Sequence, residues 1–312
     1  MRKFLLNVFI VFIYFISCTP EKPALSFDTL SILNVQVIDI IGPTIGSNRP
    51  LFSPRDIAVN RVKEIFIADY GNDRIVKLDS TFTFKTELGG FGISDYSLNG
   101  PLSIAVDNVS NLYLIDSGNA RVLRFDRRLN FISDERGFIK GQQYNFTRPS
   151  AIDVTDRGDI YIGDEGLGAC FKFDPFFVYI YEFGCRGTPQ EIGYPSDIEC
   201  GEDGRIYVAD SEYGRIMVYD DFGMFLHTIG EQVLERPSAV AVSQRTGIWV
   251  TDTGTGLLHC FNFIGKEAFR WGGQETYYLE KPAGLFIDDD DNIYVVDSST
   301  NQILIIKPVL RK

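Results

Sequence analysis

The chain has few of the side chains that metal sites and acid–base sites usually need, and it carries more acid than base. Only two of its 312 residues are histidine. Lysine and arginine together number 30 against 42 aspartates and glutamates, which gives a formal net charge of −12. Such a surface repels phosphate backbones, so nucleic acid is excluded as an expected partner. Two histidines also argue against a zinc site or a histidine base.

Helical periodicity is missing too, since no segment after residue 18 shows a useful 3.6-residue apolar period. The N-terminal apolar run, which ends at Ile16, is short for a membrane-spanning helix. What the chain does contain is a repeat of 42 to 48 residues. Such units must stack on one another to bury their apolar faces. A proline is followed fifteen residues later by an aspartate six times, as Pro54/Asp69, Pro101/Asp116, Pro149/Asp164, Pro195/Asp210, Pro237/Asp252 and Pro282/Asp297.

Each repeat contains four short strand patterns. Apolar residues alternate after the proline, as at Ile104 and Val106, and a third strand begins at positions such as Arg74. A fourth strand ends on a glycine such as Gly89. The second strand ends at the aspartate and always contains an aromatic residue: Phe66, Tyr113, Tyr161, Tyr207, Trp249 and Tyr294. Four antiparallel strands in this length form one propeller blade, so the sequence predicts an all-β, six-bladed β-propeller.

The first and last segments of the chain complete each other. The sixth repeat has room for only one strand after Asp297, from Gln302 to Lys307. The segment from Val35 to Gly42 has the pattern of a fourth strand, and Gly42 precedes Pro54 by the same twelve residues that separate Gly89 from Pro101. We therefore expect the N-terminal strand to complete blade six and to close a monomeric ring without exposed sheet edges.

Two segments resemble the NHL-repeat family of six-bladed propellers, namely residues 67–74 (IADYGNDR) and 114–121 (LIDSGNAR). The resemblance covers about residues 35 to 307. It weakens in blade three, where residues 164–169 read DEGLGA, and blades five and six also lack the arginine, with Leu257 and Gln302 there. Related propellers with amidating-lyase activity have histidines inside the ring. In this chain His227 and His259 fall on outer-strand positions, so the resemblance does not extend to that activity.

The N-terminus predicts the location of the protein. Residues 1–17 have the charge and apolar length of a secretory signal, and residues 15–18 (Phe-Ile-Ser-Cys) resemble a bacterial lipobox with Cys18 as the acylated residue. Phe15 replaces the usual leucine, so a plain secreted signal or an uncleaved anchor is the alternative. We expect residues 18–30 to tether a propeller of residues 31–312 to the bacterial cell envelope, at the outer membrane on its periplasmic or surface side. The lipid anchor is then the only membrane contact that the sequence predicts.

The repeat assigns most conspicuous residues to the scaffold. The aspartates that end the second strands are expected to hold turns, braced by an arginine where one is present, rather than to form a ring of ion pairs for a ligand. We expect the acidic run 288–291 to be a solvated turn, since it lacks the spacing of a calcium loop. Cys170 and Cys200 occupy core positions, and Cys185 follows a strand end. A disulfide between Cys170 and Cys185 stays open as an alternative to free thiols.

The exceptions to the repeat lie on the first strand, closest to the axis. Two and four residues after the proline most blades carry small residues, but three blades carry carboxylates there. Charges near a packed axis need a partner, water or a cation. A cation or basic ligand at the channel mouth is one interpretation, and a water-filled polar channel is the other; neither firmly predicts a metal. The residues concerned are Asp56, Asp153, Asp197 and Glu199, with Arg55, Glu165 and Glu212 nearby.

These observations support two functional hypotheses. The first is an envelope-anchored binding or scaffold module that holds a protein or small ligand on the loops joining strand four to strand one and strand two to strand three. The second is a lactonase-like or lyase-like enzyme that uses the axial carboxylates and Ca²⁺. No pair of nucleophile and base is visible and no motif specifies a reaction, so the sequence favours binding without a cofactor.

Overall fold

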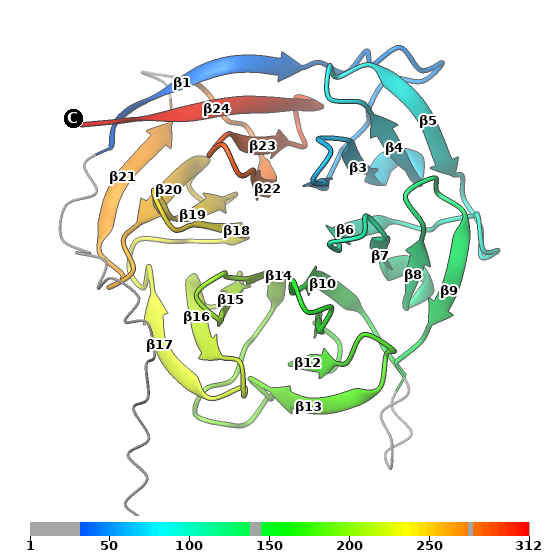
Figure 1. Cartoon of the computed structure of the whole chain (residues 1–312). Helices are drawn as coiled ribbons and strands as arrows, with labels where there is room; N and C mark the ends of the chain where they lie inside the picture. The colour runs from blue at the N-terminus through cyan, green and yellow to red at the C-terminus, as the bar shows by residue number, and fades with distance from the viewer. Residues whose placement is uncertain (1–31, 138–144, 274–276, 312) are drawn as a thin grey trace, which may run out of the picture.

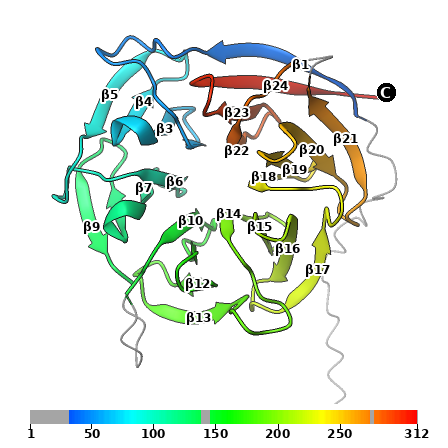
Figure 2. The ribbon, with the colours of Figure 1, turned by 180° about the vertical axis from the view of Figure 1, so that it is seen from behind.

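The computed structural model describes residues 32–137, 145–273 and 277–311. Six four-stranded antiparallel sheets are arranged as blades around a central axis (Figures 1 and 2). The six-bladed β-propeller predicted from the sequence is therefore confirmed. The helices in these ranges are two single turns of 3₁₀ type, η1 (Tyr70–Asn72) and η2 (Ser117–Asn119). Within the same ranges, no helix has the length and apolar character needed to cross a membrane.

The blades follow one another along the chain, and the first strand of each blade lies nearest the axis (Figure 1). Blades 1 to 3 comprise β2 (Asp56–Val59), β3 (Ile65–Asp69), β4 (Arg74–Leu78) and β5 (Phe84–Gly89); β6 (Pro101–Val106), β7 (Leu112–Asp116), β8 (Arg121–Phe125) and β9 (Phe131–Glu135); β10 (Pro149–Val154), β11 (Ile160–Asp164), β12 (Ala169–Phe173) and β13 (Tyr179–Phe183). Blades 4 to 6 comprise β14 (Pro195–Cys200), β15 (Arg205–Asp210), β16 (Arg215–Asp220) and β17 (Phe225–Ile229); β18 (Pro237–Ser243), β19 (Gly247–Asp252), β20 (Leu257–Phe261) and β21 (Glu267–Gly272); β22 (Pro282–Ile287), β23 (Ile293–Asp297), β24 (Gln302–Leu310) and β1 (Ile32–Ile41).

The spacing of fifteen residues between proline and aspartate is a cross-strand register. In blades 2 to 6 the proline that begins the first strand pairs with the aspartate that ends the second, as Pro101 does with Asp116. A register shift directly after the proline inserts the extra residue of a bulge. Proline suits this position because it has no N–H to donate to the ladder. The repeated spacing from proline to aspartate thus reflects the register between the two innermost strands of each blade.

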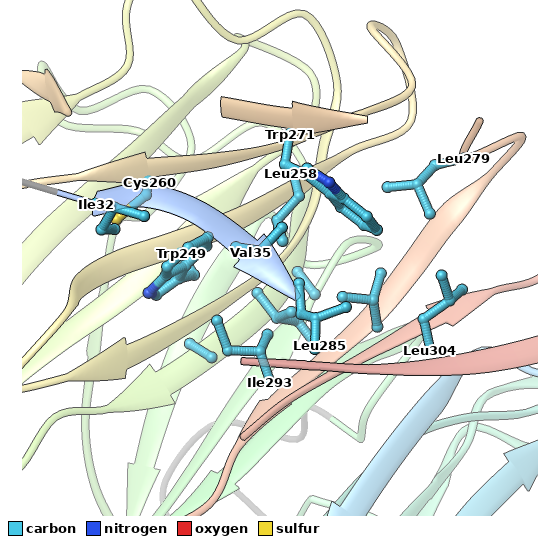
Figure 3. Close-up of a cluster of buried hydrophobic side chains, with 14 residues drawn as sticks. Ile32, Val35, Trp249, Leu258, Cys260, Trp271, Leu279, Leu285, Ile293 and Leu304 are labelled. Atoms are coloured by element: carbon cyan, nitrogen blue, oxygen red, sulfur yellow. The ribbon is translucent and has the colours of Figure 1, made fainter. Parts of the chain in front are cut away.

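The ring is closed as the sequence predicts, because β1 is hydrogen-bonded to β24 as the outer strand of blade 6. The pairing runs from Ile41 opposite Ile303 to Ile32 opposite Leu310, so both strands extend beyond the predicted residues 35–42 and 302–307. Ile32 and Val35 of β1 pack into a buried cluster with Trp249 of blade 5 (Figure 3). The N-terminal strand therefore closes the ring through both backbone pairing and apolar burial.

The hydrophobic core consists of six clusters, and each lies between two adjacent blades. The second strand contributes to two of them at once, because side chains on both of its faces are buried. Its aromatic residue is almost fully buried in every blade, from Phe66 to Tyr294. A cation lies over several of these rings, for example Arg124 at 4.9 Å from the Tyr113 centroid. Stacking of neighbours thus supplies the burial that one blade alone lacks.

The propeller has two unlike faces. We call the side with the strand four-to-one linkers and the strand two-to-three turns the mouth face. The opposite side, with the strand one-to-two and strand three-to-four turns, is the hairpin face. The acidic run 288–291 is a turn on the hairpin face, but the expectation that it is solvated is only half correct. Asp289 and Asp290 are exposed, whereas Asp288 and Asp291 are buried and accept hydrogen bonds from Asn292 N (2.9 Å) and Ser243 Oγ (2.6 Å).

Candidate functional site

A hollow of about 780 Å³ opens on the mouth face, where the central channel meets the loops. Five of the residues that the sequence singled out line it, namely Arg55, Asp56, Glu165, Asp197 and Glu212. Asp153 and Glu199 do not; they lie two residues further along their first strands, deeper in the channel. The structure thus divides the predicted site into residues of the mouth and residues of the channel.

The axial carboxylates cross the gaps between blades. Each accepts a hydrogen bond from a backbone N–H on the first strand of the next blade. These strands are the inner edges of their sheets, and an unpaired edge N–H needs an acceptor. The pairs are Ile104 N to Asp56 Oδ2 (2.8 Å), Cys200 N to Asp153 Oδ2 (2.7 Å), Val240 N to Asp197 Oδ2 (2.9 Å) and Val242 N to Glu199 Oε1 (3.2 Å).

Three serines make comparable links with neutral side chains. The residue directly after the proline is Ser150, Ser196 or Ser238 in blades 3 to 5. Each hydroxyl donates to the carbonyl oxygen of the next blade's proline, at 2.7, 2.8 and 2.6 Å. The sequence analysis did not single out these serines, although their recurrence at one repeat position was a usable signal. Side-chain bonds therefore join blade 1 to blade 2 and each successive pair from blade 3 to blade 6, and the axial carboxylates take part in them.

Burial nevertheless disfavours the charged form of the axial carboxylates. Burial raises the pKa of Asp56 to about 7, against the lowering effect of hydrogen bonds from Ile104 N and Ile57 N. Burial likewise raises the pKa of Asp153 to about 6. The pKa values of Asp197 and Glu199 are raised well above their ordinary range, first by burial and then by the neighbouring axial carboxylates. Several of these groups therefore hold a proton near neutral pH rather than four full negative charges.

Arg55 differs from the other residues at its repeat position. It stands where blades 3 to 5 carry a serine, and its guanidinium lies over the Tyr70 ring at 5.1 Å from the centroid. Its Nε atom is buried and has no hydrogen-bond partner among residues 32–137, 145–273 and 277–311. A buried donor without a partner is costly, and the side chain that carries it lines the hollow.

Two further cations line the hollow, and they come from the two blades that precede blade 1 around the ring. Arg236 and Lys281 directly precede the prolines of blades 5 and 6, and Arg55 follows the proline of blade 1. In the described part of the chain, none of these three side chains forms an ion pair. The aspartates that end the second strands hold the backbone of Arg236 and Lys281 in place. Asp252 accepts the N–H of Arg236 at 2.9 Å, and Asp297 accepts the N–H of Lys281 at 3.0 Å.

All six of these strand-two aspartates hold the linker that enters their blade. Each accepts an N–H from a residue 16 or 17 positions earlier, as Asp69 does from Phe52 at 2.7 Å. In blades 1, 2 and 4 the aspartate also binds an arginine, with Nε distances of 2.6, 2.8 and 3.2 Å. The six aspartates, hereafter the turn aspartates, are Asp69, Asp116, Asp164, Asp210, Asp252 and Asp297. Their hydrogen bonds set the shape of the mouth.

The histidines and cysteines lie away from this hollow. His227 is on β17 and His259 on β20, the fourth and third strands of their blades, where His259 contacts Glu267 at 2.8 Å. Cys170 is buried, Cys185 is half-buried, and both are free thiols, so the structure has no disulfide between them. Among the described residues, no group of three His, Cys, Asp or Glu side chains is placed to hold a metal ion. Cys18 and the signal segment lie outside the described residues.

The comparisons with known proteins define the fold class. No family model matches the sequence, and no curated protein matches it. Among solved structures, a Bacteroides thetaiotaomicron protein of unknown function has a TM-score of 0.66 at 13% identity, covering 88% of this chain and 76% of the other. Virginiamycin B lyase from Staphylococcus aureus has a TM-score of 0.64 at 14% identity, covering 88% and 100%. Kuenenia stuttgartiensis hydrazine synthase has a TM-score of 0.60 at 11% identity, covering 85% and 99%.

These similarities define the chain as a six-bladed β-propeller of the kind found in virginiamycin B lyase. At such identities they establish a shared fold and no shared chemistry. The NHL resemblance rests on the repeat segments alone and stays a prediction.

Proposed function

We propose that this propeller is an envelope-anchored binding module whose mouth hollow takes a small zwitterionic ligand. The observation that carries the proposal is Arg55, because a cation with a buried, unpartnered donor lines the hollow at a repeat position where blades 3 to 5 carry a serine. Burial in a concave site strengthens a charged hydrogen bond to a ligand. In this proposal Cys18 carries the lipid anchor, and the scaffold presents the hollow to solutes or to a partner protein of the envelope.

The charges of the hollow favour a ligand with groups of both signs. Arg236, Lys281 and Arg55 come from blades 5, 6 and 1, while Glu165, Glu212 and Glu280 come from blades 3, 4 and 6. The carboxylate of Glu165 already receives Arg148 Nε at 3.0 Å, so Glu212 is the better acceptor for an amine. Hydroxyl groups also line the hollow, on Tyr194, Ser211 and Thr253. An anionic group on the ligand would therefore face Arg55, and an amine would face Glu212.

The enzymatic alternative has no comparable observation behind it. The axial carboxylates that it would use accept N–H groups of neighbouring blades. Calcium binding in the channel remains a testable form of this alternative. It requires a rise in Tm on addition of Ca²⁺ that is abolished when Asp197→Asn and Glu199→Gln are combined.

A matched set of tripeptides tests the proposal. Trialanine with free ends should bind, measured by isothermal titration calorimetry, and blocking its amine or its carboxylate should weaken binding about tenfold in each case. Arg55→Met should weaken the free tripeptide by a similar factor because it removes the anion partner. Arg61→Met is the control, since Arg61 is an exposed arginine on the hairpin face. Equal binding of the free and doubly blocked peptides, or binding of neither, contradicts a zwitterion site.

A further inference from the structure

The strand three-to-four turns on the hairpin face share one hydrogen-bond pattern. The first residue of the turn is aspartate or asparagine, and its side-chain oxygen accepts the N–H groups two and four residues later. Asp79 accepts from Thr81 (2.9 Å) and Thr83 (3.0 Å), and Asp220 accepts from Phe222 and Met224 (both 2.9 Å). The same bonds occur in blades 2, 3 and 5. The turn is therefore fixed by its first residue and places no demand on the residue at its tip.

The tip residues nevertheless differ in kind around the ring. Blades 1 and 2 carry Thr81 and Arg128 at the tip, as expected for a solvated turn. Blades 3, 4 and 5 carry Phe176, Phe222 and Ile264, whose exposed fractions are 86%, 79% and 66%. Large apolar side chains at the most exposed position of three successive turns are not explained by folding.

These tips have exposed apolar neighbours. In blades 3 and 4 these neighbours lie beside the tip and along the outer strand. The turn of blade 4 packs against blade 3, since Gly223 lies against Tyr181, and the turn of blade 5 packs against blade 4, since Gly265 lies against Ile229. We define the apolar rim as Phe176, Val178, Ile180, Phe222, Met224, Leu226 and Ile264.

The path of the chain places the N-terminal apolar segment on the side of the rim. β24 runs from a mouth-face turn toward the hairpin face, and its last residue, Leu310, pairs with Ile32. The chain therefore enters the propeller at the hairpin face, next to blade 5. The fourteen residues from position 18 to 31 can span at most about 50 Å when fully extended. An N-terminus held in a bilayer therefore keeps the point of entry, on the hairpin face, within that distance of the membrane surface.

The overall charge selects the kind of membrane contact. A chain of net charge −12 gains nothing from anionic headgroups, and Asp174, Asp220 and Asp221 adjoin the rim in sequence against one lysine, Lys266. Aromatic and aliphatic side chains can enter the interface of a neutral bilayer without such attraction. The occupant that fits the rim is therefore a zwitterionic lipid surface rather than an acidic one.

We propose that, in the membrane-bound protein, the apolar rim of blades 3 to 5 inserts into the headgroup region of a neutral bilayer. The hairpin face then lies against the membrane, and the hollow of the mouth face opens away from it. The N-terminal lipid anchor would supply attachment, and the rim would fix the orientation of the ring.

Tryptophan reporters in the full-length chain test this orientation in phosphatidylcholine vesicles. The two native tryptophans, Trp249 and Trp271, are buried and give a constant background. Phe222→Trp places a reporter in the rim, and Phe91→Trp places one on the mouth face at an almost equal exposure of 80%. We expect acyl-chain brominated lipid to quench Phe222→Trp by about twofold and aqueous iodide to spare it, with the opposite result for Phe91→Trp.

The other outcomes overturn the proposal in distinguishable ways. Iodide quenching of both reporters would mean that the hairpin face is not in contact with lipid, as would failure of the chain to join the vesicles. Protection of Phe222→Trp from both quenchers would mean that protein covers the rim. Dependence of that protection on protein concentration would then identify a second copy, and independence would identify the chain's own N-terminal segment. Ile264→Trp repeats the measurement at a second tip in case the first substitution disturbs its turn.

Discussion

Asp69 and Asp153 are both aspartates held within the blades, one at the end of a second strand and the other in a first strand. Asp69 accepts Phe52 N at 2.7 Å and Arg74 Nε at 2.6 Å, so its charge is balanced where it stands. Asp153 accepts Cys200 N of the next blade at 2.7 Å and has no cation beside it in the described structure. Its pKa is accordingly raised by burial to about 6.

The comparison shows that a departure from the repeat is not by itself a sign of function. The turn aspartates recur in every blade and the axial carboxylates do not, yet both satisfy backbone N–H groups. Arg55 differs from both sets of aspartates, because it departs from the repeat and its Nε atom has no hydrogen-bond partner among the described residues. An unsatisfied exception is thus a stronger functional signal than an exception alone.

The variant with the largest expected effect tests whether the turn aspartates depend on the arginines that balance their charge. Arg74 is fully buried and bonds Asp69, Glu87 and the carbonyl oxygens of Arg49 and Pro50. Arg74→Met should lower the free energy of unfolding by about 3–5 kcal/mol, because it leaves a buried carboxylate unpaired. Urea denaturation at pH 7 measures the change.

Two companion variants sharpen this result. Combining Asp69→Asn with Arg74→Met should recover part of the loss, since the remaining buried charge is removed as well. Arg61→Met, at an arginine whose side chain is 63% exposed, should change stability by no more than about 0.5 kcal/mol. A loss below about 1 kcal/mol in Arg74→Met would mean that the turn aspartates do not depend on their arginines.

The fold could be predicted from the sequence because its signals are local and repeated. The spacing from Pro101 to Asp116 is a register between two adjacent strands, and it recurs in the other blades. The strand that closes the ring was recognisable from the interval between Gly42 and Pro54. The ends of β1 and β24 were placed less well, since their extension from Lys307 to Leu310 depends on pairing between distant segments.

The site was predictable only in part, because it depends on how blades are offset from one another. Arg55 and Asp197, which the sequence singled out, line the hollow. The sequence does not reveal that Val240 N of the next blade meets Asp197, since no local pattern encodes that offset. Arg236 and Lys281 were missed for a similar reason: a turn aspartate sixteen residues later holds each of them in place.

The next effect in size concerns pH and the unbalanced axial charge. A folded-state pKa of about 6 for Asp153, above its ordinary 3.8, means that the folded protein binds the proton more tightly. The contribution of Asp153 to stability is therefore fullest below pH 4 and is lost as the pH rises through 6. Asp153→Asn keeps an acceptor for Cys200 N and removes the titration. At pH 8 the variant should exceed the wild type by about 2–3 kcal/mol, and at pH 4 the two should be nearly equal.

Asp221 supplies a control of opposite sign. Hydrogen bonds from Lys172, Tyr161 and Arg157 lower its pKa to about 2 against the raising effect of burial. Its contribution is present above pH 4 and is lost as the pH falls toward 2, so Asp221→Asn should be destabilising at pH 8. Because the group is partly exposed, we expect about 1 kcal/mol. A stability difference between Asp153→Asn and the wild type that does not vary with pH would contradict the raised pKa of Asp153.

The variant with the smallest expected effect tests whether a link between blades needs a charged side chain. Ser238 makes the same kind of crossing as Asp197 with a neutral hydroxyl, which donates to Pro282 O at 2.6 Å. Ser238→Ala leaves that carbonyl unsatisfied and should lower the free energy of unfolding by about 1–2 kcal/mol. The loss should be equal at pH 5 and pH 8 because no titrating group is removed, and Ser80→Ala on an exposed turn should cause no measurable loss. If the Ser238→Ala loss varied with pH as that of Asp153→Asn does, the hydroxyl would be coupled to the axial carboxylates, and the neutral and charged links would be one network.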